Sequence, residues 1–140
     1  MIYIDSNLFI YARIDKGKIG EQTRKIISLL ESGKIEACTS VLSLDEVVWI
    51  VREELKDYKA GIDCGRMIME IPNLIVLDIT KAEILKAFDL MENGLKPRDA
   101  LHAATCLKHG VFTIVTNDSD FKKLDSLNTL NFVEFLKENK

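Results

Sequence analysis

Residues 111–121 read Val-Phe-Thr-Ile-Val-Thr-Asn-Asp-Ser-Asp-Phe, an apolar run that passes directly into polar residues. β-branched and aromatic runs of this length form buried strands, and the polar cluster behind such a run forms the turn at the strand end. Open α/β sheets hold their ligands in the crevice at the C-terminal ends of their strands. Asp118 and Asp120 are therefore either caps of the next turn or members of a site.

The N-terminus has the same design, because the apolar residues 1–4 run straight into Asp5. Between the two ends, apolar stripes with helical spacing alternate with short apolar runs. This alternation predicts an α/β protein with three α/β/α layers and a short, mostly parallel central sheet. Strands are expected near residues 1–4, 35–38, 74–77, 111–115 and 130–133, helices near residues 8–12, 26–32, 43–55, 59–71, 80–91 and 98–109, and a solvated tail from Glu134.

The composition is that of an ordinary globular protein, with 47% apolar and 29% charged residues. The length predicts one domain over residues 1–140. No apolar run reaches the ~18 residues that span a bilayer, and no signal peptide is visible, so we expect a cytoplasmic protein with no membrane contact. Cys38, Cys64 and Cys106 form no Cys-x-x-Cys pair, which agrees with a reducing compartment.

The net charge of −3 argues against a broad basic surface as the sole means of binding a nucleic acid. It does not exclude a phosphate-rich substrate, since charges can be unevenly placed. If a bound cation neutralised several acids at one site, the rest of the chain would be close to neutral.

Four acids stand where predicted elements begin or end, and we call them the acidic quartet. Asp5 and Asp118 follow predicted strands, whereas Glu46 and Asp99 begin predicted helices. In a parallel α/β sheet these positions lie at one edge, so the four carboxylates are expected to converge. Each also has a structural explanation. Asp5 and Asp118 could begin turns, Glu46 could close a capping box with Ser43, and Asp99 could complement a helix dipole.

Converging carboxylates repel one another and raise one another's pKa values, which a bound cation would relieve. Oxygen ligands without cysteine or histidine select Mg²⁺ or Mn²⁺ rather than Zn²⁺, and these ions suit phosphoryl chemistry. His102 is expected on the helix surface, away from the apolar stripe, rather than at a metal. No serine or cysteine has a neighbouring base that would make it a covalent nucleophile.

The predicted helix that contains Glu46 is apolar on two sides. Val47 and Val51 belong to its core stripe, whereas Glu46 points roughly the opposite way and shares that side with Trp49 and Ile50. A side of this composition is too apolar for plain solvent exposure. It is expected to line a cleft or to meet a partner, although simple packing would explain it equally well.

Four motifs in the chain resemble those of the PIN domain family, and the chain is similar in spacing and length to VapC-type toxins of toxin–antitoxin pairs. The likeness covers almost the whole chain. Each motif is weak alone, but the four in this order are specific. They are Asp5-Ser6-Asn7, Leu44-x-Glu46-x-x-Trp49, Pro97-Arg98-Asp99-Ala100-Leu101-His102-Ala103-Ala104 and Thr116-Asn117-Asp118-x-Asp120-Phe121.

This resemblance implies a metal-dependent endoribonuclease with a PIN-like fold, the toxin of a type II toxin–antitoxin pair. The acidic quartet matches the family's catalytic and metal-binding acids, with Mg²⁺ as the expected ion and Mn²⁺ as the alternative. Asp120 matches an acid that sometimes joins them. Ser6 or Asn7 matches a polar position that orients water or phosphate, and Thr116 has a similar supporting place.

The resemblance also implies partners. RNA is the expected substrate, cleaved to 5′-phosphate and 3′-hydroxyl ends; family members commonly form homodimers and are inhibited by a small antitoxin that lies across the active-site cleft. Basic residues flank the acids in sequence and could hold the RNA backbone, although a solvated charged face would look the same. These residues are Lys96, Arg98, Lys122 and Lys123.

Two other functions stay open at this stage. The same chemistry could serve housekeeping RNA processing or decay. A receiver-like phospho-acceptor domain also gathers acids and Mg²⁺ at strand ends, and Asp78 after residues 74–77 would be its acceptor. The receiver alternative leaves Glu46 and Asp99 unexplained.

Overall fold

The computed structural model describes residues 1–140 and contains five β-strands, seven α-helices and one 3-10 helix. None of its helices has both the length and the apolar character that crossing a membrane requires. The strands are β1 (Ile2–Ile4), β2 (Ala37–Ser40), β3 (Leu74–Leu77), β4 (Thr113–Val115) and β5 (Asn128–Leu130). The helices are α1 (Ser6–Ile14), α2 (Lys18–Glu31), α3 (Val41–Leu55), α4 (Tyr58–Met69), α5 (Lys81–Glu92), α6 (Pro97–Lys108), the 3-10 helix η1 (Ser119–Lys123) and α7 (Phe132–Glu138).

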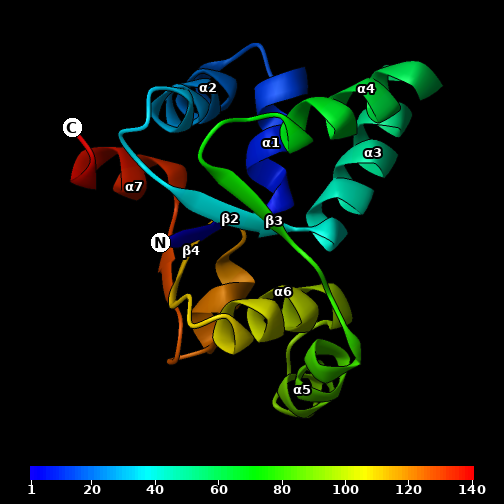
Figure 1. The fold of residues 1–140 in the computed structure, drawn as a ribbon, viewed down its shortest axis with the longest axis vertical. Helices are drawn as coiled ribbons and strands as arrows, with labels where there is room; N and C mark the ends of the chain where they lie inside the picture. Colours follow the sequence, from blue (N-terminus) through cyan, green and yellow to red (C-terminus); the bar gives the residue numbers. More distant parts are fainter.

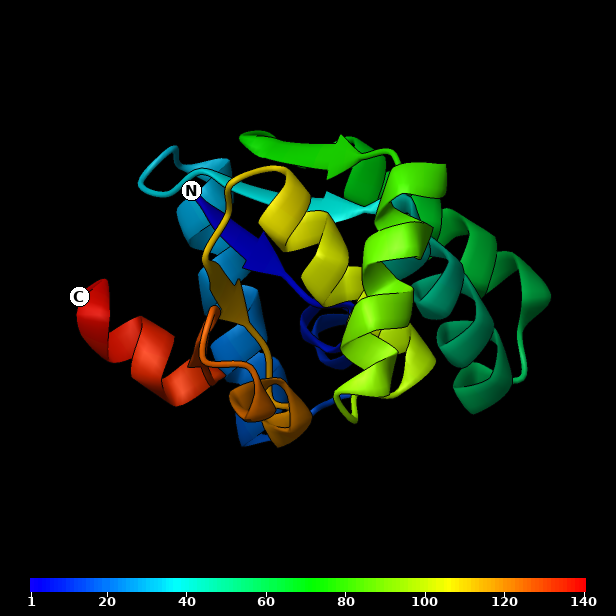
Figure 2. The same cartoon turned by 90° about the horizontal axis from the view of Figure 1, so that it is seen from below.

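All five strands are parallel and form one sheet in the order β3-β2-β1-β4-β5 (Figure 2). The chain runs outward from β1 to β2 and β3, and then returns to the other side of β1 for β4 and β5. The strand order therefore reverses between β1 and β4, which is where sheets of this kind bind ligands. Asp5 follows β1 and Thr116 follows β4 at this point. Asp78 follows the edge strand β3, so the receiver alternative does not fit.

Helices cover both faces of the sheet, which confirms the three-layer α/β/α architecture (Figure 1). The helices α1–α4 and α7 lie on one face, and α5 and α6 lie on the other. Consecutive residues of β1 point to opposite faces, so Ile4 enters the first core and Tyr3 the second. The largest buried side chains of the first core are Leu8, Ile26, Leu30 and Phe132, and those of the second include Ile114 and Phe121.

The C-terminal residues are not a solvated tail, so that expectation is wrong. They form α7, whose first turn is capped by Asn131 through a hydrogen bond from the backbone N–H of Glu134. Phe132 and Phe135 of α7 are buried in the first core. A helix of seven residues has too few turns to show a helical period, which is why the pattern did not predict it. β5 also ends at Leu130 rather than beginning there.

Two helices begin earlier than expected. Asp5 is the N-cap of α1, and its carboxylate accepts a hydrogen bond from the backbone N–H of Ser6. α3 begins at Val41, directly after β2, with no side-chain cap. The capping box proposed for Glu46 is therefore absent, and its carboxylate is available for other contacts. β2 is likewise shifted by two residues from the predicted 35–38.

The helix that carries Asp99 is fastened to its neighbour through Glu83. The capping box of α5 is present, with Glu83 accepting hydrogen bonds from Thr80, and the buried Glu83 carboxylate lies 3.4 Å from the Lys108 ammonium of α6. Burial by itself would raise the pKa of Glu83. The hydrogen bonds from Thr80 and the charge of Lys108 outweigh it and lower the pKa from 4.5 to about 2.

Glu83→Gln is expected to lower the free energy of unfolding at neutral pH. A carboxyl group whose pKa is lower in the folded state stabilises the protein above its unfolded pKa, and this contribution disappears as the pH falls through the folded pKa. The difference between wild type and variant in urea unfolding should therefore shrink between pH 4.5 and about 2. Glu92→Gln, an exposed change at the end of the same helix, is the control and should show no such loss.

Candidate active site

Asp5 lies at the sheet edge with both carboxylate oxygens already held. Its Oδ1 accepts a hydrogen bond from the backbone N–H of Ser6 at 2.8 Å, and its Oδ2 accepts one from the Thr116 hydroxyl at 2.7 Å. The Ser6 hydroxyl lies 3.5 Å from Oδ1. Asp5, Ser6 and Thr116 are all buried, so the orientation of this carboxylate is set by the fold.

Thr116 joins three parts of the site through one hydroxyl group. Its Oγ1 donates to Asp5 and accepts from the side-chain amide of Asn7 and from the backbone N–H of Asp118, both at 3.0 Å. A hydroxyl has one donor and two acceptor positions, so all of them are used. The other side-chain atom of Asn7, Oδ1, is buried without a hydrogen-bond partner.

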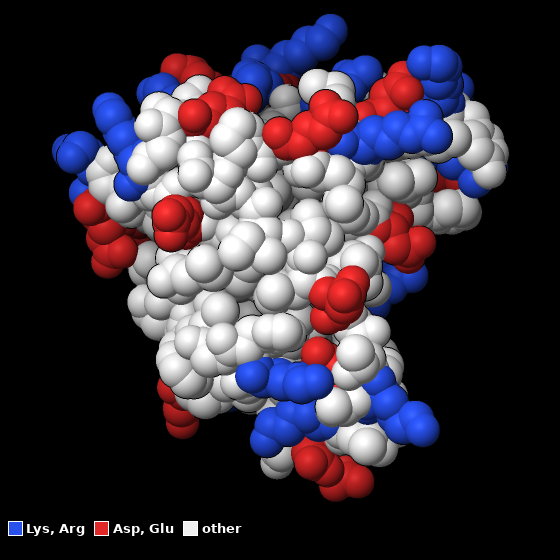
Figure 3. Space-filling model, in the orientation of Figure 1, with Lys and Arg blue, Asp and Glu red and all other residues white.

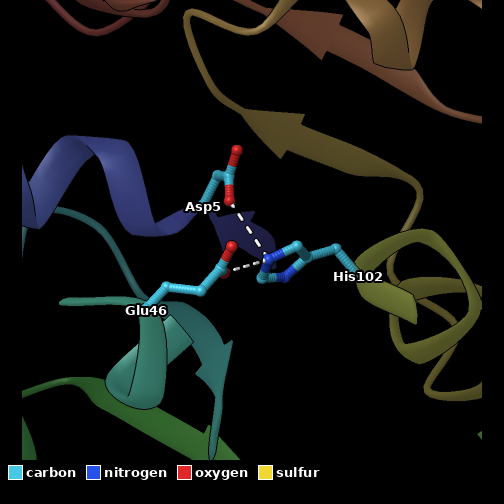
Figure 4. Close-up of side chains that lie close together, drawn as sticks. All are labelled: Asp5, Glu46 and His102. Carbon is cyan, nitrogen blue, oxygen red and sulfur yellow. Dashed lines mark hydrogen bonds and ion pairs between the residues drawn. The ribbon is translucent and has the colours of Figure 1, made fainter. Parts of the chain in front are cut away.

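The side chains of Glu46 and His102 also lie close to Asp5 (Figure 4). Glu46 comes from α3 and His102 from α6, and the Nε2 atom of His102 lies 2.6 Å from Oε1 of Glu46 and 3.4 Å from Oδ1 of Asp5. Burial would lower the pKa of His102, but Asp5 and Glu46 outweigh it and raise that pKa above 6.5. These three side chains form the deeper part of the acidic site.

The expectation that His102 lies on the surface is wrong, because only 1% of the residue is exposed. Residues three apart lie on the same side of a helix, so His102 points to the same side of α6 as Asp99. The spacing of three residues from Asp99 was therefore the signal in the sequence that could have placed His102 in the site. It was missed because small alanines form the apolar stripe of α6 and leave room for a larger polar side chain to be buried beside them.

The outer part of the site consists of Asp99, Asp118 and Asp120, each with an oxygen within 4.8 Å of the others. Asp118 caps η1, because its Oδ1 accepts a hydrogen bond from the backbone N–H of Asp120 at 2.9 Å. Asp118 is therefore both the cap of η1 and one of the three acids that lie close together. An open pocket of about 420 Å³ contains these three acids together with Glu46, Lys96, Pro97 and Arg98.

The crowding of acids changes the protonation of Asp99. Burial raises its pKa first, and the negative charges of Asp118 and Asp5 raise it further, to about 6 from 3.8. His102 partly opposes this rise. A cation bound nearby would oppose this rise in the pKa of Asp99.

A divalent cation fits this arrangement. Five carboxylates and one ring nitrogen, that of His102, make up the two groups, and the buried Asn7 oxygen has no hydrogen-bond partner. Hard cations prefer oxygen ligands, and no thiol takes part in either acidic group. The two groups together contain every acid that the sequence placed in the site. They are Asp5 and Glu46 in the deeper group, and Asp99, Asp118 and Asp120 in the outer one.

The four predicted RNA-contact residues are placed unequally around the pocket. Lys96 and Arg98 line it, and the Lys96 ammonium lies 3.5 Å from Asp120. Lys122 and Lys123 are both exposed on η1 and neither lines the pocket, although the Lys123 ammonium lies 4.0 Å from Asp120. On the face drawn in Figure 3, basic and acidic side chains are interspersed around an uncharged middle, so this face has no broad basic surface.

Trp49 confirms that α3 presents an apolar group near the acids. It is 54% exposed and lies beside a second pocket of about 310 Å³ that also contains Glu46, Ile50 and Arg98. Glu46 and Arg98 belong to both pockets, so the two are adjacent. The expected cleft beside Glu46 is therefore present.

Comparison with family models matches the PIN domain over residues 2–127, which is most of the chain. The chain belongs to the PIN domain family. Nucleases of this family work with divalent metals, and the acidic groups described above are of the kind that such ions need. Comparison with curated protein sequences gave no match.

Several solved structures have the same fold. VapC20 from Mycobacterium tuberculosis, a sarcin–ricin loop cleaving toxin, has a TM-score of 0.72 and 15% identity over 87% of this PIN domain chain and 93% of its own. VapBC2 from Rickettsia felis, bound to a promoter DNA fragment, has a TM-score of 0.70 and 21% identity over 94% and 98%. FitAcB from Neisseria gonorrhoeae has a TM-score of 0.72 and 19% identity over 95% and 99%. At these identities the likeness shows the PIN fold alone.

Thr116→Val is expected to lower the free energy of unfolding by about 1–3 kcal/mol, because a valine of the same shape leaves buried groups without their hydrogen-bond partner. Thr129→Val is the matched control, since the Thr129 hydroxyl is buried and has no partner to lose. The control should be neutral or stabilising. Equal losses of unfolding free energy for the two variants in urea would show that the hydrogen bonds of the Thr116 hydroxyl do not stabilise the fold.

Proposed function

We propose that this PIN domain is a metal-dependent endoribonuclease and the toxin of a type II toxin–antitoxin pair. The observation that carries the proposal is the convergence of the acidic quartet where the strand order of the sheet reverses. The likeness to VapC20, which cleaves the sarcin–ricin loop, supports RNA as the substrate. Because VapC20 is a toxin, the same likeness supports a toxin more than an RNA-processing enzyme.

Mg²⁺ is the proposed ion, with Mn²⁺ able to replace it. Asp5 and Asp118 would hold it most directly, Glu46 and Asp99 directly or through water, and Asp120 would join them. When bound, such an ion stabilises the negative charge of the reacting phosphodiester and lowers the pKa of the attacking water.

The protein's own groups position the reactants. Ser6 and Thr116 hold Asp5, and the unpartnered Asn7 oxygen is available to water or phosphate. Lys96 and Arg98, at the rim of the pocket, would bind backbone phosphates on either side of the scissile bond. Attack by water in line with the 3′ leaving oxygen leaves a 5′-phosphate and a 3′-hydroxyl end.

An antitoxin and a second copy of the chain are the proposed protein partners. The exposed Trp49 and the adjacent Ile50 provide an apolar contact beside the acidic pocket, which would let a bound antitoxin cover the cleft. A neighbouring gene for a small protein that forms a complex with this chain and stops cleavage would decide for the toxin role over housekeeping RNA processing.

Asp5→Asn is expected to reduce RNA cleavage by at least about 100-fold, the upper end of the loss seen when even an outer partner of a metal ligand is removed. Cleavage of structured and unstructured RNAs should be measured with Mg²⁺, with Mn²⁺ and with chelator, and product ends should be analysed. Asp125→Asn makes the same chemical change at an exposed aspartate outside both acidic groups. This control should keep full activity.

Undiminished cleavage by Asp5→Asn, or cleavage that persists in chelator, would overturn the proposed function. Circular dichroism of both variants should match the wild type, and both should stay folded at the assay temperature in a thermal unfolding scan, so that a loss of activity reports on the site.

Arg98→Gln is expected to weaken RNA binding in chelator, where no cleavage occurs. Loss of one phosphate contact to a single strand should reduce the slope of log affinity against log salt concentration by about 0.7. Lys25→Gln, an equally exposed change on α2, should leave the slope unchanged. Fluorescence anisotropy across a salt series measures both slopes. Equal slopes for the two variants would show that Arg98 does not contact an RNA phosphate.

A further inference from the structure

His102 is the only basic side chain buried in the protein, and it lies between two acids of the quartet (Figure 4). Nothing in the proposed reaction requires a histidine, since carboxylate oxygens would hold the ion and the ion and basic side chains would bind the phosphodiester. His102 is nevertheless only 1% exposed and lies 2.6 Å from a carboxylate oxygen, so it constrains the position of that carboxylate. The contacts of its two ring nitrogens indicate how the ring is held and which groups it holds.

The Nε2 atom of His102 must carry a hydrogen. Its partner at 2.6 Å is Oε1 of Glu46, and an ionised carboxylate can only accept a hydrogen bond. The same nitrogen lies 3.4 Å from Oδ1 of Asp5. One N–H group therefore lies between two negative charges that belong to different elements, α3 and the end of β1.

The opposite ring nitrogen is held by a row of buried hydroxyl groups. Nδ1 of His102 lies 2.7 Å from the Tyr3 hydroxyl, which lies 2.7 Å from the Ser40 hydroxyl. Tyr3 can donate to Nδ1 or accept from it while Ser40 takes the other role, so either protonation state of the ring is matched. Because Tyr3 and Ser40 belong to the neighbouring strands β1 and β2, these hydrogen bonds connect the ring to the interior of the sheet.

We propose that His102 is a positioning residue, which holds the carboxylates of Glu46 and Asp5 in place for the divalent cation without binding the cation itself. The inference rests on the proposed metal dependence. A ring nitrogen that donates its hydrogen to Glu46 has no lone pair to offer a metal, whereas the second oxygens of both acids remain free of this contact. Residues that orient metal ligands in this way typically contribute 10–100-fold to metal affinity.

The test compares two replacements of His102 by their Mn²⁺ affinity in the full-length chain. The side-chain amide of glutamine reaches the position of Nε2, so His102→Gln should keep the contact to Glu46 and remain within about 3-fold of wild type. The shorter asparagine cannot reach Glu46, so His102→Asn should weaken Mn²⁺ binding by about 10–100-fold. Electron paramagnetic resonance of free Mn²⁺ measures the affinity without any RNA present.

Each outcome decides the matter. Unchanged affinity in His102→Asn would overturn the proposal, and an equal, large loss in both variants would show that the ring is a metal ligand. If His102→Asn does not fold, Tyr3→Phe tests the same row of hydrogen bonds, and it should weaken Mn²⁺ binding by a smaller factor of about 3–10. Unchanged affinity in Tyr3→Phe would then overturn the proposal.

Failure of the proposed function gives a different result. If the wild type binds Mn²⁺ and the two His102 variants separate as expected, but no RNA is cleaved, the positioning role stands and the ribonuclease assignment falls. If the wild type cleaves RNA and both variants bind Mn²⁺ as tightly as the wild type, the ribonuclease assignment stands and the positioning role falls. A wild type that binds no Mn²⁺ overturns both.

Discussion

The pairing of β1 with a parallel strand on each side is the constraint on which the rest of the structure depends. Only three residues long, β1 lies between β2 and β4, and its residues Tyr3 and Ile4 enter the two cores on opposite faces of the sheet. A shift of register by one residue would exchange these two faces. Because Asp5 follows immediately, the same pairing that builds the core also sets the position of the first acid.

The site is an accumulation of like charge that the fold maintains at a cost. Asp99 shows that cost, since burial and its acidic neighbours raise its pKa to about 6. Hydrogen bonds from Thr116, Ser6 and His102 offset part of the repulsion by holding individual carboxylates. A divalent cation would supply the remaining counter-charge, which is why the same geometry that is unfavourable by itself is suited to metal binding.

Local signals predicted much of the fold. The strand at residues 74–77 and the helices near residues 80–91 and 98–109 depend on neighbouring residues, and the structure has them within one residue of where the sequence placed them. The acids were also found from local position, as residues that follow strands or begin helices. What local patterns did not predict is α7 and the burial of His102, because both depend on contacts with residues far away in the chain.

By itself, the sequence determined the α/β class, the parallel sheet and the identity of the acidic residues, because strand and helix periods and the order of four motifs are properties of neighbouring residues. Only the tertiary structure decided how those acids divide into a deeper and an outer group, and that a histidine lies between two of them. The distances between β1, α3 and α6 are set by the packing of alanines and small polar groups around Tyr3. No period in a single segment records that packing.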